Sequence, residues 1–135
     1  ARQTFVGIWI NNLLQGRPLK VWEGGQLRDF TYVDDTVGAL LSAAADERAY
    51  GKIFNLGGDC VISLKELAKL LIEIEGKGDF IICPFPQERK DIDIGDYYSD
   101  FKKIRDLIGW KPEVSIKDGL TRTLDFYRRH LKEYI

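Results

Sequence analysis

The sequence of 135 residues contains no methionine, one histidine and two cysteines. His130 is the only histidine, and neither Cys60 nor Cys83 has a histidine-rich neighbourhood, so nucleophilic triads and zinc sites are excluded. We therefore expect no metal and no catalytic residue in this chain. We also expect His130 to be a solvated residue of a terminal helix, and both cysteines to be plain buried thiols in or near strands.

Long apolar runs and an excess of one charge are missing as well. No stretch approaches the roughly 20 apolar residues that cross a bilayer, and the first four residues do not resemble a signal peptide. Lysine and arginine number 20 against 21 aspartates and glutamates, a net charge of −1, which gives no general attraction to nucleic acid or an anionic membrane. We expect a soluble, cytoplasmic protein that binds neither, and whose anionic ligands need a local cluster of cations.

The hydrophobic content of 44% is enough for the core of one domain. Helical periods and short apolar runs alternate along the chain, which predicts an α/β fold with about five helices. Expected helices cover residues 4–15, a segment from Asp34 or Asp35 through Ala45, residues 63–75, a segment from Ser99 or Asp100 to Gly109, and the segment from Ser115 onwards. Expected strands are 19–22, 30–33, 53–56 and 80–83, and residues 87–96 are expected to form a surface loop.

Capping residues support two of these helices. Ser63 and Glu66 have the spacing of a capping box, in which each residue satisfies a free backbone N–H at the start of a helix. Ser115 and Asp118 repeat the pattern. Asp34 or Asp35 is expected to cap the second helix, because a carboxylate there accepts from free N–H groups and complements the helix dipole.

Isolated cations in loops are the remaining candidates for chemistry. Arg28 follows a glycine turn, and Arg89 and Lys90 follow a proline-rich segment. Two arginines from separate loops could clamp a diphosphate, because a guanidinium makes paired, charge-assisted hydrogen bonds to phosphate oxygens. The alternative is plain ion pairing of Arg28 with Asp29, and of Arg89 with Glu88 or Asp91.

The segment Gly24–Asp35, GGQLRDFTYVDD, resembles the G-x-Q-x-R-D-F-x-Y-V-D-D signature of the extended short-chain dehydrogenase/reductase family of NAD-dependent nucleotide-sugar epimerases and dehydratases. The resemblance continues in order along nearly the whole chain. The further matching segments are Arg2-Gln3, GRPL at 16–19, FNLG at 54–57, SLKELA at 63–68, DYYSD at 96–100 with Lys102 or Lys103, and LIGWKP at 107–112.

The resemblance implies roles for particular residues. Arg28 would contact the nucleotide diphosphate. A second phosphate contact would fall on Arg89, with Lys90 as the alternative because the spacing is shifted. The strand before the glycine turn would border the nucleotide base, which puts the Lys20 backbone and Trp22 beside it. The ligand would be a nucleotide-diphosphate sugar, the cofactor of the whole enzyme NAD, and its assembly a homodimer.

Two of the family's motifs are absent, namely the G-x-x-G-x-x-G turn that holds NAD and the catalytic Y-x-x-x-K pair. Tyr98 and Lys102 have the spacing of that pair but lie in the wrong part of the family's order. The resemblance thus implies that residues 1–135 are a carboxy-terminal, nucleotide-sugar-binding portion without the amino-terminal NAD-binding half. Such a chain would be inactive alone, and would expose apolar surface. The alternatives are a non-catalytic nucleotide-binding module and a relative kept as a structural or interaction protein.

Overall fold

The computed structural model describes residues 4–90 and 92–134. The Arg2-Gln3 pair of the family resemblance, and Asp91 as a partner of Arg89, lie outside the described residues. The helices are α1 (Phe5–Leu14), α2 (Val33–Ala45), the 3-10 helix η1 (Glu47–Ala49), α3 (Leu64–Glu75), α4 (Gln87–Lys90), α5 (Lys102–Ile108) and α6 (Ile116–Tyr134). The strands are β1 (Leu19–Trp22), β2 (Leu27–Asp29), β3 (Val61–Ser63) and β4 (Phe80–Cys83). This is the predicted α/β class, with six α-helices in the described part rather than about five.

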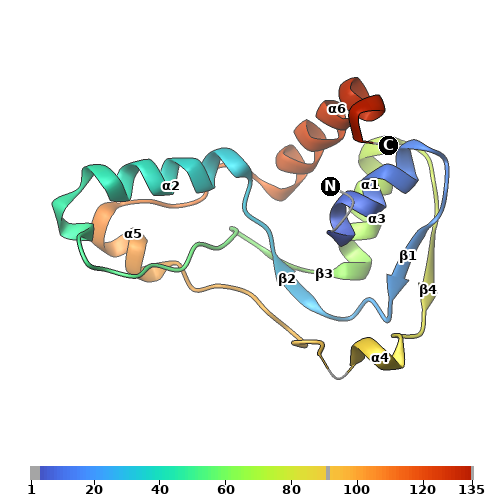
Figure 1. The fold of residues 1–135 in the computed structure, drawn as a ribbon, viewed down its shortest axis with the longest axis horizontal. Coiled ribbons are helices and arrows are strands. Elements are labelled where there is room, and N and C mark those ends of the chain that lie inside the picture. Colours follow the sequence, from blue (N-terminus) through green and yellow to red (C-terminus); the bar gives the residue numbers. More distant parts are fainter. Residues whose placement is uncertain (1–3, 91, 135) are drawn as a thin grey trace.

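The elements form a body and an arm (Figure 1). The body contains α1, α3, α6 and the parallel pair β1–β4, in which Leu19 is opposite Phe80 and Trp22 opposite Cys83. Its core residues are Trp9, Ile10, Leu13, Leu19, Val21, Leu67, Ala68, Leu71, Leu120 and Leu124. A second, antiparallel pair of strands, β2–β3, leads from the body towards the arm.

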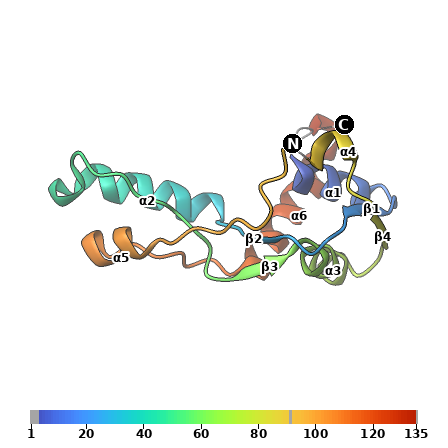
Figure 2. The same cartoon turned by 90° about the horizontal axis from the view of Figure 1, so that it is seen from below.

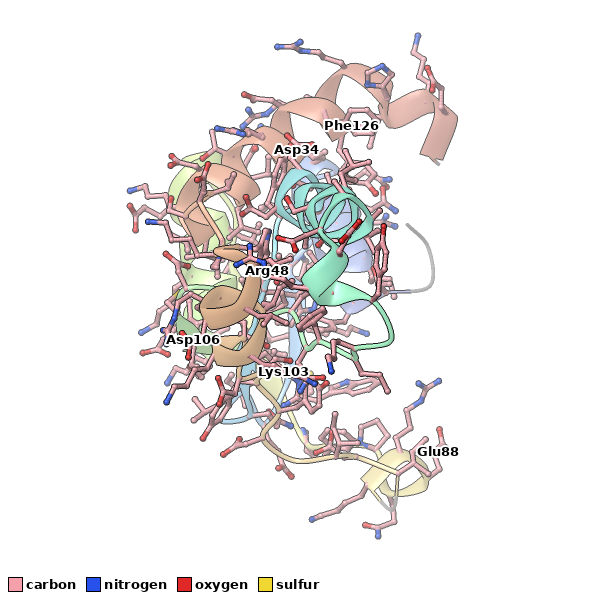
Figure 3. The ribbon with its side chains drawn as sticks, turned by 90° about the vertical axis from the view of Figure 1, so that its left-hand side faces the viewer. Asp34, Arg48, Glu88, Lys103, Asp106 and Phe126 are labelled. Atoms are coloured by element: carbon pink, nitrogen blue, oxygen red, sulfur yellow. The ribbon has the colours of Figure 1, made fainter. Side chains whose placement is uncertain are left out.

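The arm consists of α2, η1 and α5, which lie together at one end of the molecule in two perpendicular views (Figures 1 and 2). Its small core contains Ala39, Ile104 and Trp110. Seen end-on in Figure 3, the arm carries Arg48 and Asp106, whereas Glu88 on α4 lies well apart from it. The molecule therefore has two separate hydrophobic cores.

Local capping explains where several helices begin and end. The predicted capping box is present on α3: the Ser63 hydroxyl oxygen accepts from the Glu66 N–H at 3.2 Å, and Glu66 accepts from the Ser63 N–H at 3.0 Å. Gly76 ends the helix with a φ of 76°, a backbone conformation that glycine adopts without steric cost. Ser115 caps α6 by accepting from the Asp118 N–H at 3.2 Å. The local sequence is thus sufficient to set these helix ends.

The first turn of α2 differs from the prediction. The helix begins at Val33, before both of the expected cap residues, and its N-cap Tyr32 makes no side-chain cap hydrogen bond. Neither Asp34 nor Asp35 is therefore the cap. Asp35 is buried instead, and its carboxylate accepts from the Val114 N–H at 3.0 Å. The predicted strand at 30–33 is likewise wrong, because the residues that pair are 27–29, immediately before it.

The predicted buried strand at 53–56 is not formed, and Ile53 is 83% exposed. A strand exists only through hydrogen bonds to a neighbour, and no ladder partner lies beside this segment in the described part of the chain. The prediction also missed β3 at 61–63, and α4, which lies within the expected surface loop.

Helix α2 has an unusual outward face. Besides buried Asp35 and Ala39, its large apolar residues are mostly in solvent: Val33 is 61% exposed, Leu40 64% and Leu41 67%. These residues recur at the spacing of one helical face. None of the helices in the described residues is long and apolar enough to cross a membrane. The stripe is therefore a surface feature of the arm.

Candidate functional site

The body contains a cavity of about 450 Å³, which is the larger of the two cavities described below. Its lining comes from five parts of the chain: α1, β1, the turn and strand β2, the start of α3, and the segment from Phe85 to Asp93. The lining residues are Phe5, Ile8, Trp9, Asn12, Lys20, Trp22, Gln26, Arg28, Leu64, Phe85, Arg89 and Asp93. Four of the five residues predicted to bind substrate, Lys20, Trp22, Arg28 and Arg89, thus meet at one cavity, whereas Lys90 does not line it.

The alternation of β1 places two of these residues. Leu19 and Val21 are buried in the core, and Lys20 and Trp22 are exposed on the opposite face, as the two-residue period of a strand requires. The Lys20 backbone, predicted to border a base, is already engaged: its carbonyl oxygen accepts from the Trp9 indole N–H at 2.9 Å. Lys20 therefore faces the cavity with its side chain, and its carbonyl is used to hold α1 against β1.

Trp22 forms an aromatic shelf at the end of β1. Its ring centroid lies 5.4 Å from that of Phe85, with an interplanar angle of 59°. The Arg89 guanidinium carbon lies 5.8 Å from the centroid of the Trp22 ring, within the range of a cation–π contact. Trp22 and Arg89 are therefore in contact in the lining of the cavity, although they come from β1 and α4.

Arg28 lies in β2 with its side chain 16% exposed. One of its terminal nitrogens, Nη1, donates to the Leu27 carbonyl at 2.7 Å and also to the Gly95 carbonyl. The other, Nη2, lies 3.8 Å from the Asp93 carboxylate. These contacts fix the plane of the guanidinium, so that the remaining charge is presented from a rigid strand.

Arg28 was alternatively expected to pair with Asp29, but the acid beside it is Asp93. Asp29, its sequence neighbour, uses its carboxylate to accept from the backbone N–H groups of Gly58 at 3.0 Å and Ser99 at 3.1 Å. A Cβ on Gly57 would stand 2.7 Å from that carboxylate, so only glycine allows this close approach. Asp29 is therefore a structural residue that ties three segments together, and Asp93 is the acid beside Arg28.

The segment before Tyr97 is tied to β2 by the backbone. The Leu27 N–H donates to the Asp96 carboxylate at 2.8 Å, and the Tyr97 N–H donates to the Leu27 carbonyl at 2.9 Å. The Gly95 N–H donates to the Asp93 carboxylate at 3.2 Å. These bonds bring Asp93 to the cavity, although it lies 65 positions after Arg28.

Helix α1 contributes the apolar side of the cavity. Phe5 and Ile8 are 39% and 44% exposed, and both line the cavity. Phe5 packs edge-on against the Trp9 ring at a centroid distance of 5.2 Å. The cavity thus joins an apolar side to a side that carries cations, which is the composition of ligand pockets in general.

Gln26 is a lining residue that sequence reasoning missed as a candidate, although it is the glutamine of the G-x-Q-x-R-D-F signature. Its Oε1 atom is shielded from solvent and has no hydrogen-bond partner. Among the described residues it is the single buried side-chain oxygen or nitrogen in that condition. Asp93 was missed as well, and no local pattern marks it.

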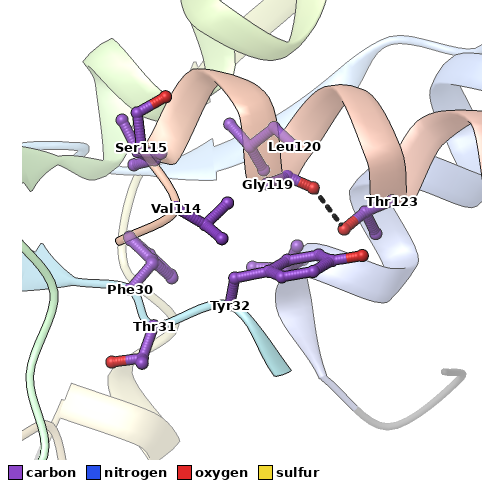
Figure 4. A pocket seen from close by; sticks show the side chains of 10 residues that line it. Phe30, Thr31, Tyr32, Val114, Ser115, Gly119, Leu120 and Thr123 are labelled. Atoms are coloured by element: carbon purple, nitrogen blue, oxygen red, sulfur yellow. Dashed lines mark hydrogen bonds between the residues drawn. The ribbon is translucent and has the colours of Figure 1, made fainter. Parts of the chain in front are cut away.

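A second, smaller cavity of about 140 Å³ lies between α6 and the segment before α2 (Figure 4). Phe30, Thr31, Tyr32, Val114 and Leu120 are among the residues that line it. The Thr123 hydroxyl, which is also in the lining, donates to the Gly119 carbonyl at 2.6 Å, so its polar group is already satisfied. This cavity has the character of a packing gap rather than of a polar site.

The other residues considered in the sequence lie away from the larger cavity. Tyr98 is 56% exposed and Lys102 is exposed at the start of α5, and neither lines either cavity. The His130 ring stacks on the Phe126 ring at 4.4 Å, and its Nδ1 lies 2.9 Å from the Phe126 carbonyl oxygen. No group of three or more histidine, cysteine or acidic residues in the described part could hold a metal ion.

Both cysteines are free and only partly buried, so the expectation of buried thiols is wrong. Cys83 lies in β4, whose residues are partly or well exposed. Burial raises the pKa of the Cys60 thiol, and the charge of the neighbouring Asp59 carboxylate raises it further.

Fold and cavity together define an α/β protein with an aromatic shelf and two arginines around one pocket, an arrangement suited to an anion attached to a flat ring. A model of the NAD dependent epimerase/dehydratase family matches residues 2–57. The chain is 32% identical over 123 residues to dTDP-glucose 4,6-dehydratase of Streptomyces griseus, an alignment that covers 90% of this chain and 37% of that protein.

Solved structures agree with this match. The structure of UDP-glucose 4-epimerase of Thermotoga maritima with UDP-glucose has a TM-score of 0.79 and 30% identity, covering 95% of this chain and 40% of that one. UDP-glucuronic acid 4-epimerase of Bacillus cereus in complex with NAD has a TM-score of 0.74 and 27% identity, covering 93% and 37%. The chain is similar to members of the NAD-dependent epimerase/dehydratase family over nearly its whole length, as the signature implied, and spans less than half the length of these relatives.

Proposed function

We propose that this chain is the carboxy-terminal, nucleotide-sugar-binding portion of an NAD-dependent epimerase or dehydratase, and that the larger cavity holds the nucleotide diphosphate. One observation carries the proposal: Arg28 and Arg89, from segments about 60 positions apart in the chain, line the same cavity as Trp22. Two arginines can bind one diphosphate only if they share a pocket, as Arg28 and Arg89 do. Arginines on opposite faces of the fold would have removed its physical basis.

The dimensions and chemistry of the cavity support this function. Its volume of about 450 Å³ lies in the range of small-molecule sites. A base can rest on Trp22, and the diphosphate can reach Arg28 and Arg89 by charge-assisted hydrogen bonds. Binding there would hold the sugar in position for chemistry elsewhere in the enzyme. Cytoplasmic localisation and homodimeric assembly stay predictions.

The two glycine pairs among the described residues do not fit NAD, which the Bacillus cereus relative contains. Gly24 lies in the turn between two strands, and Gly57 and Gly58 are occupied by packing against Asp29 and Phe30. Neither glycine pair opens a helix, where a dinucleotide pyrophosphate would be held. We therefore expect these glycines to hold no NAD and the chain alone to be inactive.

Substitution of Arg28 tests the proposal. In the complete protein, Arg28→Ala should weaken binding of UDP or dTDP by about 1.5–3 kcal/mol, the range for a charge-assisted contact. Isothermal titration calorimetry measures the change. Arg105→Ala is the matched control, because Arg105 lies on α5 in the arm, paired with Asp106, away from the cavity. Unchanged affinity of the Arg28 variant for both nucleotides would refute the diphosphate site.

The alternative is a non-catalytic nucleotide-binding or interaction module derived from the same family. The exposed apolar stripe of α2 favours an interaction role. A purely structural or interaction protein predicts that no nucleoside diphosphate or nucleotide sugar binds at all. A thermal-shift series of nucleotide sugars on the complete protein distinguishes a nucleotide-binding protein from a purely structural or interaction protein, because a bound ligand raises the unfolding temperature.

A further inference from the structure

Gln26 Oε1 needs a hydrogen-bond donor that the described residues do not supply. Almost all buried polar atoms in folded proteins are paired, and a buried acceptor without a partner costs about 1–3 kcal/mol. Such a cost at a cavity wall is removed when a ligand brings the missing donor. The last side-chain torsion of glutamine is broad, so rotation of the carboxamide can turn this oxygen into the cavity.

The neighbouring cations do not supply this donor. Arg28 Nη1 already donates to two backbone carbonyls, and its Nη2 faces Asp93. Arg89 lies over the Trp22 ring. Asp93 itself is a carboxylate, which accepts and does not donate when ionised. The acceptors in the lining nearest to Arg28 in the chain or in space therefore include Gln26 and Asp93.

These acceptors distinguish among anionic ligands. Pyrophosphate at neutral pH has charge for the arginines but few protons to donate. A nucleoside diphosphate has the same charge and, in addition, neutral O–H and N–H donors on its ribose and base. Gln26 is in the turn that joins Trp22, the aromatic shelf, to Arg28, where the nucleoside part of such a ligand would lie.

We propose that Gln26 is a specificity-determining residue, whose carboxamide oxygen accepts a hydrogen bond from a neutral donor of the nucleoside, so that the cavity prefers nucleoside diphosphates to bare pyrophosphate. This inference rests on the proposed function of the cavity. The donor is either a ribose hydroxyl or the imide N–H of a uracil or thymine ring.

Binding by the complete protein and its Gln26→Leu variant tests the inference. UDP affinity should fall about 3- to 15-fold in the variant, the size of one hydrogen bond, and pyrophosphate affinity should not change. In the wild type, one of 2′-deoxyuridine, 3′-deoxyuridine and N3-methyluridine diphosphate should bind more weakly than UDP by the same factor. The Gln26→Leu variant should lose that discrimination, which identifies the donor as ribose or base.

Thermal unfolding of the free proteins separates this role from a structural one. Leucine removes an unpaired polar atom, so the free variant should unfold at the same or a higher temperature. A lower unfolding temperature together with equal loss of UDP and pyrophosphate binding would overturn the inference, as would unchanged UDP affinity. If Arg28→Ala also leaves both ligands unaffected, the proposed function fails with it. If Arg28→Ala weakens both, only the role of Gln26 is refuted.

Discussion

Asp93 should oppose binding of the very anion that Arg28 attracts. Its carboxylate lies 3.8 Å from Arg28 Nη2, and the two side chains are 25% and 16% exposed. A diphosphate that approaches Arg28 meets this negative charge first. Replacement by asparagine keeps the size and an acceptor oxygen but removes the charge, so we expect Asp93→Asn to bind nucleoside diphosphates more tightly.

A phosphate bound to Arg28 would lie about as close to the Asp93 carboxylate as the guanidinium does, roughly 4 Å away, and the magnitude follows from that separation. Two unit charges at this separation interact by about 1 kcal/mol in bulk water and by about 4 kcal/mol at an effective dielectric constant of 20. Both side chains reach solvent, and exposed pairs yield values at the low end of such ranges. A gain of about 1–2 kcal/mol, or roughly 5- to 30-fold in Kd, is therefore expected at low salt. The gain should shrink as ionic strength rises, because salt screens partly exposed charges.

Calorimetric titration of UDP and pyrophosphate into the complete protein measures this effect at two salt concentrations. Asp106→Asn is the control with the same change of net charge, because Asp106 lies on α5 in the arm and pairs with Arg105. If Asp93→Asn weakens binding of both ligands, the carboxylate supports the bound state, and the reasoning from charge is wrong. An equal gain in the Asp106 variant would show a nonspecific effect of net charge.

Three further outcomes are expected. Ser63→Ala should lower the free energy of unfolding by about 1 kcal/mol in urea titrations, because the α3 capping box with Glu66 is lost. Alkylation of Cys60 by iodoacetamide, followed by mass spectrometry, should be slower at neutral pH than that of free cysteine, because its pKa is raised and less thiolate is present. The 135-residue chain expressed alone should self-associate through α2, and a Leu40→Ser/Leu41→Ser double variant should shift it towards monomer in light scattering.

The sequence predicted the fold best where the signal is local. For α3, the capping box, the apolar face and the αL glycine lie within 14 residues, and each fixes one end or one side of the helix. For β1, the bounds match the prediction, because a short apolar run is closed by a glycine turn. The strand predicted at 53–56 failed because its formation depends on a neighbour that no local pattern contains.

The candidate site divides in the same way. Trp22 and Arg28 were predicted because they stand beside or in the family signature, and Arg89 because it stands in the loop before the DYYSD segment; the cavity brings them together. Gln26 was missed because its buried, unpaired oxygen is apparent only in the folded chain, and Asp93 was missed because its contact with Arg28 is distant in the sequence. The pairing of Leu27 with Asp96 and Tyr97, about 70 positions further along, decides which carboxylate faces Arg28. Spacing in the sequence does not encode that register.

The larger cavity and the exposed apolar stripe of α2 lie in different parts of the molecule, so variants of one should not affect the other. The lining residues of the larger cavity belong to the body, to β2 and the turn before it, or to the segment after β4, and none belongs to α2 or α5. The apolar stripe of α2 and the unpaired extended segment at 53–56 belong to the arm, whose core is a separate cluster around Trp110. Residues in different clusters without shared partners contribute additively to a good approximation. Changes of nucleotide affinity in Arg28, Gln26 and Asp93 variants therefore report on the cavity itself, and changes of association in α2 variants report on the arm.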